Sequence, residues 1–389
     1  MISQQTTAEV LSQLIAFDTT SRNSNLELID YVREVLKPFG VDIELTFDRD
    51  RNKANLFATL GGGSAPGVVL SGHTDVVPVT GQDWSLDPFQ SEIRGERMFG
   101  RGTCDMKGYI AACLTKVEDI LEADLATPVH FAFSYDEEVG CVGVTDLLEE
   151  LKKKPVQPRA CIIGEPTSMK VIRAHKGMLF KRCCIHGKSA HSSLVDQGVN
   201  AITVAARIIA NIDSIQKRIQ EEGPFDAGFN PPYTTLHSGV IRGGTVNNII
   251  PSYCEFEFEI RNLPEQSPWP LFREVEDFAN ALLPDMHRIS GETGIDWHAI
   301  ADYPGMDTPV DDKLIAEISG LLGTSSVPGK VSYGTEGGHF QSAGIPTIIC
   351  GPGTIEQAHK PDEFIDLDQL NQCDRFLSTL IESLHKLPE

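Results

Sequence analysis

Five separate segments of the chain place a histidine or an acidic residue close to glycine or proline. Their potential metal ligands are His73, Asp105, Glu138, Glu165 and His359. Two imidazoles and three carboxylates can form a shell for two divalent ions about 3.5–4 Å apart that share one bridging carboxylate. The mixed nitrogen and oxygen donors suit zinc, with cobalt or manganese as substitutes. The chemistry to expect from such a site is hydrolysis by an activated water molecule.

Two further carboxylates accompany these ligands. Asp75 follows His73 by two residues and can orient its imidazole, while Glu137 stands next to Glu138 and is left over as a general base. Taken singly, each segment also has a simpler interpretation. His73 could be a loop histidine, Asp105 could cap a helix, and the acidic run at 136–138 could be a solvated turn. Only their combination favours a metal site.

Short apolar runs precede most of these residues. Runs that are apolar at every position are typical of strands whose sheet is covered on both faces, and they occur at 68–70, 129–133, 161–163 and 347–350. Helical spacing lies between them, at 110–121 and 370–384. The alternation predicts an open α/β sheet flanked by helices, in which ligands bind beyond the carboxyl ends of the strands. The candidate ligands follow the strands at those ends.

The middle third of the chain has a different pattern. Apolar and acidic residues alternate from Cys254 to Ile260, which predicts a half-exposed antiparallel strand, and Ile202, Ala205, Ile209 and Ile212 form a helical stripe. We therefore expect an α+β domain at 177–300, inserted into a discontinuous catalytic domain at 1–176 and 301–389.

Composition restricts the partners. The 33 basic and 55 acidic residues give a formal net charge of −22, which argues against nucleic-acid or anionic-membrane partners. The glycine-rich stretch around Asp105 lacks the spacing of a phosphate-binding loop, so a nucleotide-binding enzyme is the weaker alternative. Nine cysteines without a C-x-x-C pair indicate buried thiols in a reducing compartment. With no signal-peptide pattern near the N-terminus, we expect a cytoplasmic protein.

The five segments, in this order and spacing, resemble the M20 family of metallo-amidohydrolases and peptidases over essentially the whole chain. The resemblance implies a zinc-peptidase-like catalytic domain in which His73, Asp105 and Glu165 hold one zinc ion. It implies that Asp105, Glu138 and His359 hold the other. Asp75 would orient His73, and Glu137 would be the general base.

The inserted segment resembles the lid and dimerisation domain of that family. On this resemblance His191, in the run from Gly187 to Ser193, would help to hold the oxyanion, in its own subunit or in a partner's site. Asn248 and Arg261 match substrate-facing positions, and a guanidinium can clamp a carboxylate through two hydrogen bonds. The resemblance also implies a homodimer formed through the lid domain.

Within the family, the runs Gly334–Gly338 and Cys350–Glu363 resemble the acetylornithine deacetylase branch, although alanine is commoner than Gly334. This implies hydrolysis of N-acetyl-L-ornithine in arginine biosynthesis, with Glu336 near the substrate's free ammonium. The alternatives are succinyl-diaminopimelate desuccinylase, a general aminoacylase or a dipeptidase. The alternative outside enzymes is a metal-binding scaffold without turnover. For Glu336 itself, pairing with a neighbouring lysine or arginine is the simpler interpretation.

Overall fold

The computed structural model describes residues 5–62 and 65–385, and the chain divides into two compact units. The first unit comprises Met1–Ala174, Met306–Lys330 and Thr335–Glu389, and the second comprises His175–Gly305 and Val331–Gly334. The main segment of the second unit begins two residues before and ends five residues after the expected insertion at 177–300. The assignment of 331–334 to the second unit was not anticipated.

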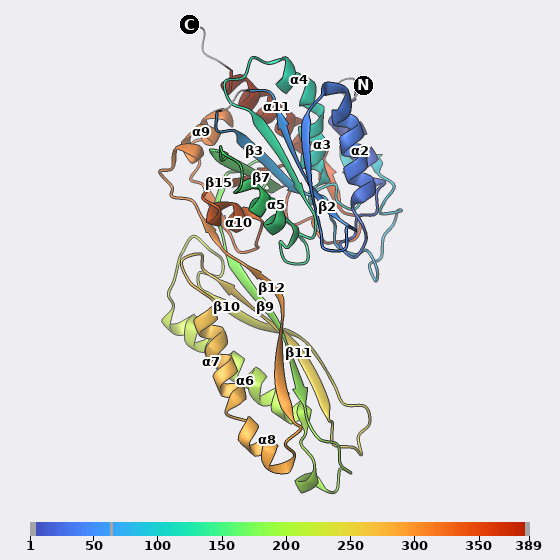
Figure 1. The fold of residues 1–389 in the computed structure, drawn as a ribbon, viewed down its shortest axis with the longest axis vertical. Coiled ribbons are helices and arrows are strands. Elements are labelled where there is room, and N and C mark those ends of the chain that lie inside the picture. Colours follow the sequence, from blue (N-terminus) through green and yellow to red (C-terminus); the bar gives the residue numbers. More distant parts are fainter. Residues whose placement is uncertain (1–4, 63–64, 386–389) are drawn as a thin grey trace. The chain divides into compact units, whose positions relative to one another are not determined.

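A mixed nine-stranded sheet forms the centre of the first unit (Figure 1). Its order is β1-β2-β6-β3-β7-β15-β8-β13, with β14 paired to β8. Pairing is parallel between β6, β3, β7 and β15 and antiparallel at β1, β2 and β8. The strands are β1 (Asp42–Phe47), β2 (Ala54–Leu60), β3 (Val68–His73), β6 (Val129–Ser134), β7 (Ala160–Pro166), β8 (Ile172–His175), β13 (Met306–Asp307), β14 (Gly329–Val331) and β15 (Thr347–Gly351).

Helices cover both faces of this sheet, which confirms the predicted α/β class. One layer contains α1 (Thr7–Ile15), α2 (Leu26–Leu36), α3 (Lys107–Thr115), α4 (Val117–Glu122), α9 (Lys313–Leu321) and α11 (Leu367–Ser383), and the other contains α5 (Gly143–Leu151) and α10 (Gly337–Ser342). A small sheet of β4 (Glu92–Arg94), β5 (Arg97–Phe99) and β16 (Phe364–Asp366) lies beside them.

The apolar runs that predicted strands are the buried central strands of this sheet. Every residue of β3, β7 and β15 is buried, as expected where helices pack on both faces. The single helix expected at 110–121 is wrong in one respect. Lys116 interrupts it, so that α3 is buried at all but its last residue and α4 is a short separate helix.

The second unit is an α+β structure. Its antiparallel sheet has the order β10-β11-β9-β12 and is packed against α6 (Ala201–Glu222), α7 (Trp269–Asn280) and α8 (Leu283–Ile289) (Figure 1). The strands are β9 (Gly177–His186), β10 (Thr235–Gly243), β11 (Tyr253–Asn262) and β12 (Gly294–Tyr303). The alternation predicted in β11 is present, with Cys254, Phe256, Phe258 and Ile260 buried. The predicted stripe of α6 is wrong at Ile202, which is 37% exposed.

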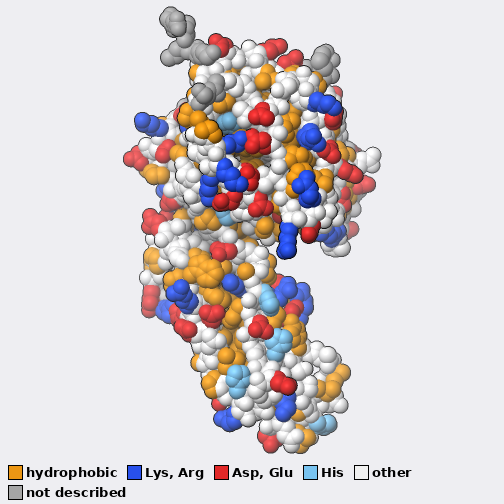
Figure 2. All heavy atoms as spheres, in the orientation of Figure 1, with side chains coloured by type: hydrophobic (Ala, Val, Ile, Leu, Met, Phe, Trp, Pro, Cys, Tyr) orange, Lys and Arg blue, Asp and Glu red, His pale blue; other side chains and the backbone are white. Residues whose placement is uncertain are grey.

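Acidic and basic side chains are interspersed on the face shown in Figure 2, and the acidic surplus of the composition is spread over both units. All nine cysteines are buried and free. Among the residues that the structure describes, no helix is both long and apolar enough to cross a membrane.

Candidate metal centre and active site

All the candidate ligands except Asp105 lie at the carboxyl ends of the four parallel strands of the first unit. His73 is the last residue of β3, Glu165 lies near the end of β7, and the turn carrying Glu137 and Glu138 follows β6. His359 belongs to the loop after β15. The register pairs His73 with Ser134, so the imidazole and the acidic turn leave the sheet side by side. Strand ends therefore position most of the site, as ligand sites in such sheets require.

Asp105 connects the two histidines, because each of its oxygens faces a different imidazole. His73 Nε2 is 3.0 Å from Asp105 Oδ1, and His359 Nε2 is 3.3 Å from Asp105 Oδ2. A second carboxylate completes each side, since His73 Nε2 is 3.7 Å from Glu165 Oε1 and His359 Nε2 is 3.0 Å from Glu138 Oε2. This is the arrangement that a bridging carboxylate between two ions needs.

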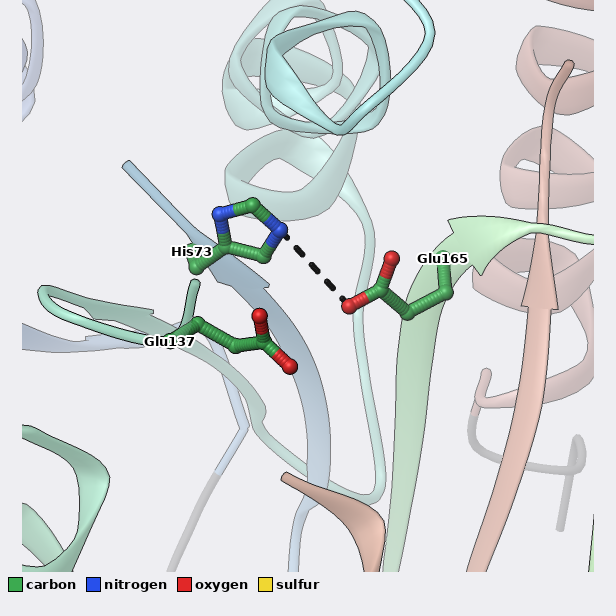
Figure 3. A group of neighbouring side chains, drawn as sticks. All are labelled: His73, Glu137 and Glu165. Atoms are coloured by element: carbon green, nitrogen blue, oxygen red, sulfur yellow. Dashed lines mark ion pairs between the residues drawn. The ribbon is translucent and has the colours of Figure 1, made fainter. Parts of the chain in front are cut away.

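Other groupings of the same atoms are also compact. The possible ligand atoms of His73, Glu137 and Glu165 lie within 4.8 Å of one another, and so do those of His73, Asp105 and Glu138. Figure 3 shows the first of these groups, with the carboxylates of Glu137 and Glu165 approaching the imidazole of His73. Geometry alone therefore allows Glu137 to be a ligand as well as a base.

Asp75 supports two parts of the site at once. His73 Nδ1 lies 2.9 Å from the Asp75 main-chain oxygen and 3.6 Å from Asp75 Oδ1, so the closer contact is to the backbone. The Asp75 carboxylate accepts hydrogen bonds from the amides of Glu137 (3.1 Å) and Glu138 (3.3 Å) and from the Ser21 hydroxyl (2.7 Å). Asp75 thus also fixes the acidic turn, a contact that spacing along the sequence does not reveal.

Glu137 itself is held by its immediate neighbours. The Cys141 thiol donates to Glu137 Oε1 at 3.4 Å, and burial raises the pKa of that thiol, which keeps it a donor. Asp136, one residue before, is paired with Lys53 at 2.5 Å. Both Asp136 and Cys141 have left-handed backbone conformations, with φ of 56° and 55°, which are uncommon for residues other than glycine. The backbone of the turn is therefore closely constrained on both sides of Glu137.

Several buried carboxylates lie close together in the site, where burial and their mutual repulsion both oppose ionisation. Burial, followed by repulsion from Asp105, raises the pKa of Glu138 to about 7 and that of Glu165 well above its usual range. Burial likewise raises the pKa of Glu137, and His73 opposes this only in part. Hydrogen bonds to Asp105 and Glu138 raise the pKa of His359 to about 10.

A cation would relieve this repulsion, because buried charges are tolerated when they are paired or coordinate metals. Four carboxylates and two imidazoles supply more than enough donors for two divalent ions. The residues present therefore fit a metal pair, and the assignment of individual ligands to each ion stays a prediction.

Glu336 lies beside the site, immediately before α10. Its side chain is as deeply buried as that of His73. Burial raises its pKa to about 7, and the neighbouring hydroxyls of Ser134 and Ser71 lower that pKa only in part. Within residues 5–62 and 65–385, Glu336 Oε1 has no hydrogen-bond partner. Its charge also acts on Glu137 and raises the pKa of that residue. The simpler interpretation, a salt bridge to a nearby lysine or arginine, has no counterpart among the described ion pairs.

The remaining candidates belong to the second unit. His191 is exposed and pairs with Ile249, next to Asn248, whose carbonyl accepts from the Ser192 amide at 3.0 Å. Because the Ser193 amide donates to His191 Nδ1 at 3.2 Å, a neutral imidazole there carries its proton on Nε2. Arg261 lies on β11 and makes two hydrogen bonds to Glu259.

Sequence reasoning missed the residues that hold the ligand loops. Glu363 and Arg101 form an ion pair of 2.6 Å, and both side chains are almost completely buried. Each lies in a motif that contains a ligand, but nothing in the spacing shows that the two motifs meet. A buried arginine without an obvious partner in its own segment is the one signal that could have indicated a distant acid.

Known proteins match nearly the whole chain. The profile of peptidase family M20/M25/M40 matches residues 69–383. The acetylornithine deacetylase of Proteus mirabilis is 35% identical over 98% of this chain and 97% of its own length, and that of Photorhabdus laumondii is 36% identical over 96% of each.

Solved structures of low identity share the fold. An M20 family metallo-carboxypeptidase from Sulfolobus solfataricus has a TM-score of 0.79 at 18% identity, covering 97% of this chain and 99% of that one. A dinuclear metal-binding peptidase of the M20 family from Bacillus subtilis has a TM-score of 0.65 at 16% identity, covering 97% and 98%. The family profile and the relatives at 35–36% identity show that the chain belongs to peptidase family M20/M25/M40 and is a metal-dependent hydrolase.

Proposed function

We propose that this enzyme hydrolyses N-acetyl-L-ornithine to L-ornithine and acetate, a reaction of arginine biosynthesis. The observation that supports it most is the cluster in which Asp105 faces both His73 and His359 while Glu137 lies at its edge. The relatives that are 35–36% identical over nearly their full length carry the name of that activity. The acid Glu336 is the group available for a cationic side chain.

The residues of the chain have distinct tasks in this proposal. Two bound divalent ions, which we propose to be zinc, with cobalt or manganese as substitutes, supply an acidified water and polarise the scissile carbonyl. Glu137 accepts a proton from the attacking water and delivers it to the leaving nitrogen. A base that returns its proton works best when its pKa lies near the operating pH.

Residues of the second unit are proposed to bind the substrate. His191 carries its donor on Nε2, as an oxyanion ligand requires, and lid closure would bring it to the substrate only during turnover. Asn248 is placed beside His191 by the Ser192 hydrogen bond. Arg261 would exchange its contact with Glu259 for the substrate carboxylate, a bidentate partner of the same geometry.

A substrate panel tests the proposal. We expect kcat/KM for N-acetyl-L-ornithine to exceed that for N-acetyl-L-methionine by at least about 10-fold, because a buried carboxylate left unpaired disfavours a substrate without the cation. Succinyl-diaminopimelate and a dipeptide each carry a free ammonium, so the charge of Glu336 does not by itself exclude them, and we expect lower kcat/KM for both. Steady-state rates with and without a chelator provide the measurement. A higher value for any of the other three would replace acetylornithine by that specificity within the family. No chelator-sensitive turnover of any of them would favour the metal-binding scaffold.

Glu336→Gln tests the source of specificity. Loss of a charged hydrogen bond of about 1.5–3 kcal/mol should raise KM for N-acetyl-L-ornithine roughly 10- to 100-fold. N-acetyl-L-norvaline, which lacks the side-chain ammonium, serves as the matched substrate, and its KM should fall or stay the same, because the substitution removes a carboxylate that this substrate leaves unpaired. A fall in kcat for both substrates alike would show that Glu336 acts on Glu137 and does not contact the ammonium.

We further propose a cytoplasmic homodimer formed through the second unit, without nucleic-acid or membrane partners. The edge strand β10 supports this, because Ile241 is 53% exposed there and Val246 and Ile249 are exposed in the connection that follows. Sedimentation equilibrium of the full chain should give twice the monomer mass of 42.6 kDa. The substitution Ile241→Lys should shift it towards the monomer.

A further inference from the structure

The two glycine- and proline-containing motifs that carry Asp105 and His359 are joined by one buried carboxylate. Glu363 Oε2 accepts from Arg101 Nη1 at 2.6 Å and from the Gly102 amide at 3.1 Å. Its Oε1 accepts from the amides of Cys104 at 2.9 Å and Asp105 at 3.1 Å. The four hydrogen bonds that the Glu363 carboxylate accepts therefore fix the loop that presents the Asp105 carboxylate.

The same group of hydrogen bonds continues to His359. Arg101 Nη2 donates to Gln82 Oε1 at 2.6 Å, and Trp84 Nε1 donates to the same oxygen at 3.0 Å. Because two donors identify this atom as the amide oxygen, the amide nitrogen must be the atom that faces the main-chain oxygen of His359, at 2.9 Å. Gln82 thus transmits the position of Arg101 to the backbone of a proposed metal ligand.

His359 needs such support more than the other candidate ligands. It lies on the loop between β15 and β16, its side chain is 53% exposed, and its φ is 62°. His73, by contrast, is 1% exposed and is fixed by its strand. A residue other than glycine keeps a left-handed conformation only where its surroundings hold it there.

We propose that Glu363, Arg101 and Gln82 are positioning residues that set the separation of Asp105 and His359, and with it the affinity of the metal ion on the His359 side. This rests on the ligand set of the proposed function. The partners that orient metal ligands commonly contribute a factor of about 10–100 to metal affinity.

The full-length chain, stripped of metal, should be titrated with Co²⁺ by calorimetry and by visible absorption. Gln82→Glu is the sharpest variant, because it removes the donor to His359 but keeps the acceptor for Arg101. Gln90→Glu is the matched control, because Gln90 is an exposed residue of the same segment and its substitution adds the same negative charge. An added negative charge by itself would strengthen cation binding, so a loss in Gln82→Glu comes from the missing donor.

We expect Gln82→Glu to weaken one of the two Co²⁺ equivalents about 10- to 100-fold, with an altered spectrum for that equivalent and the other unchanged. His359→Ala should abolish the same equivalent, and the equivalent that remains should keep its affinity when Gln82→Glu is added. Two intact equivalents in Gln82→Glu, or a weakened remaining equivalent in the double variant, would overturn this inference alone. Two intact equivalents in His359→Ala would instead overturn the proposed ligand set.

Discussion

Replacing Glu137 by glutamine should lower kcat for N-acetyl-L-ornithine by about 10²- to 10⁴-fold while both metal ions stay bound. The amide keeps the shape and the hydrogen bond from Cys141 but cannot accept a proton from water. KM should change little, because substrate binding is assigned to other residues. Steady-state kinetics and metal analysis by mass spectrometry on the same preparation measure both quantities.

The control for this substitution is Glu122→Gln, at an exposed position on α4, which removes the same charge far from chemistry and should leave kcat unchanged. The metal content decides between two roles for Glu137. Loss of an ion in Glu137→Gln would make Glu137 a ligand, as the compact group with His73 and Glu165 allows. Full activity in the variant would remove it from the mechanism.

Removal of the metal ions should abolish turnover and make stability strongly dependent on pH. In the metal-free protein the pKa of Glu138 is raised from 4.5 to about 7 and that of His359 from 6.5 to about 10. A group whose pKa is raised on folding stabilises the folded state at low pH and loses that contribution as the pH rises through the folded value. The melting temperature of the metal-free protein should therefore fall between about pH 5 and pH 9.

Asp105 does not reverse this trend. Burial opposes its ionisation, but hydrogen bonds from His359 and His73 outweigh burial and hold the pKa of Asp105 below its usual range, so its contribution is already complete at pH 5. The protein reloaded with Zn²⁺ is the control and should melt higher, with a weaker dependence on pH. Equal melting curves with and without metal would contradict the cation-binding role of the cluster.

The parts of the site that were predictable from sequence are those that local pattern determines. Apolar runs placed β3, β6, β7 and β15, and the residues that end them had to meet at one edge of the sheet. Contacts between residues far apart in the sequence could not be predicted. One example is the pair of hydrogen bonds that the Asp75 carboxylate accepts from the amides of the acidic turn. The break of the predicted helix at Lys116 was also invisible, because apolar spacing continues across it.

The partners of Glu363 could not be predicted from the sequence either. Its motif was noticed, yet its four donors come from residues about 260 positions earlier in the chain. Periodicity predicts local helices and strands, but it does not show which distant loops contact each other in the fold. Only the fold brings the two loops together.

The two oxygens of Asp105, each turned to a different histidine, have a thermodynamic consequence. In the proposed ligand set, an ion bound on the His73 side would fix the orientation and partly neutralise the charge of a carboxylate that the other ion would also use. The two binding events would therefore be linked, and any such coupling is reciprocal whichever ion arrives first. The singly loaded protein would then be a species with its own affinity, and its population would govern how activity recovers as metal is returned.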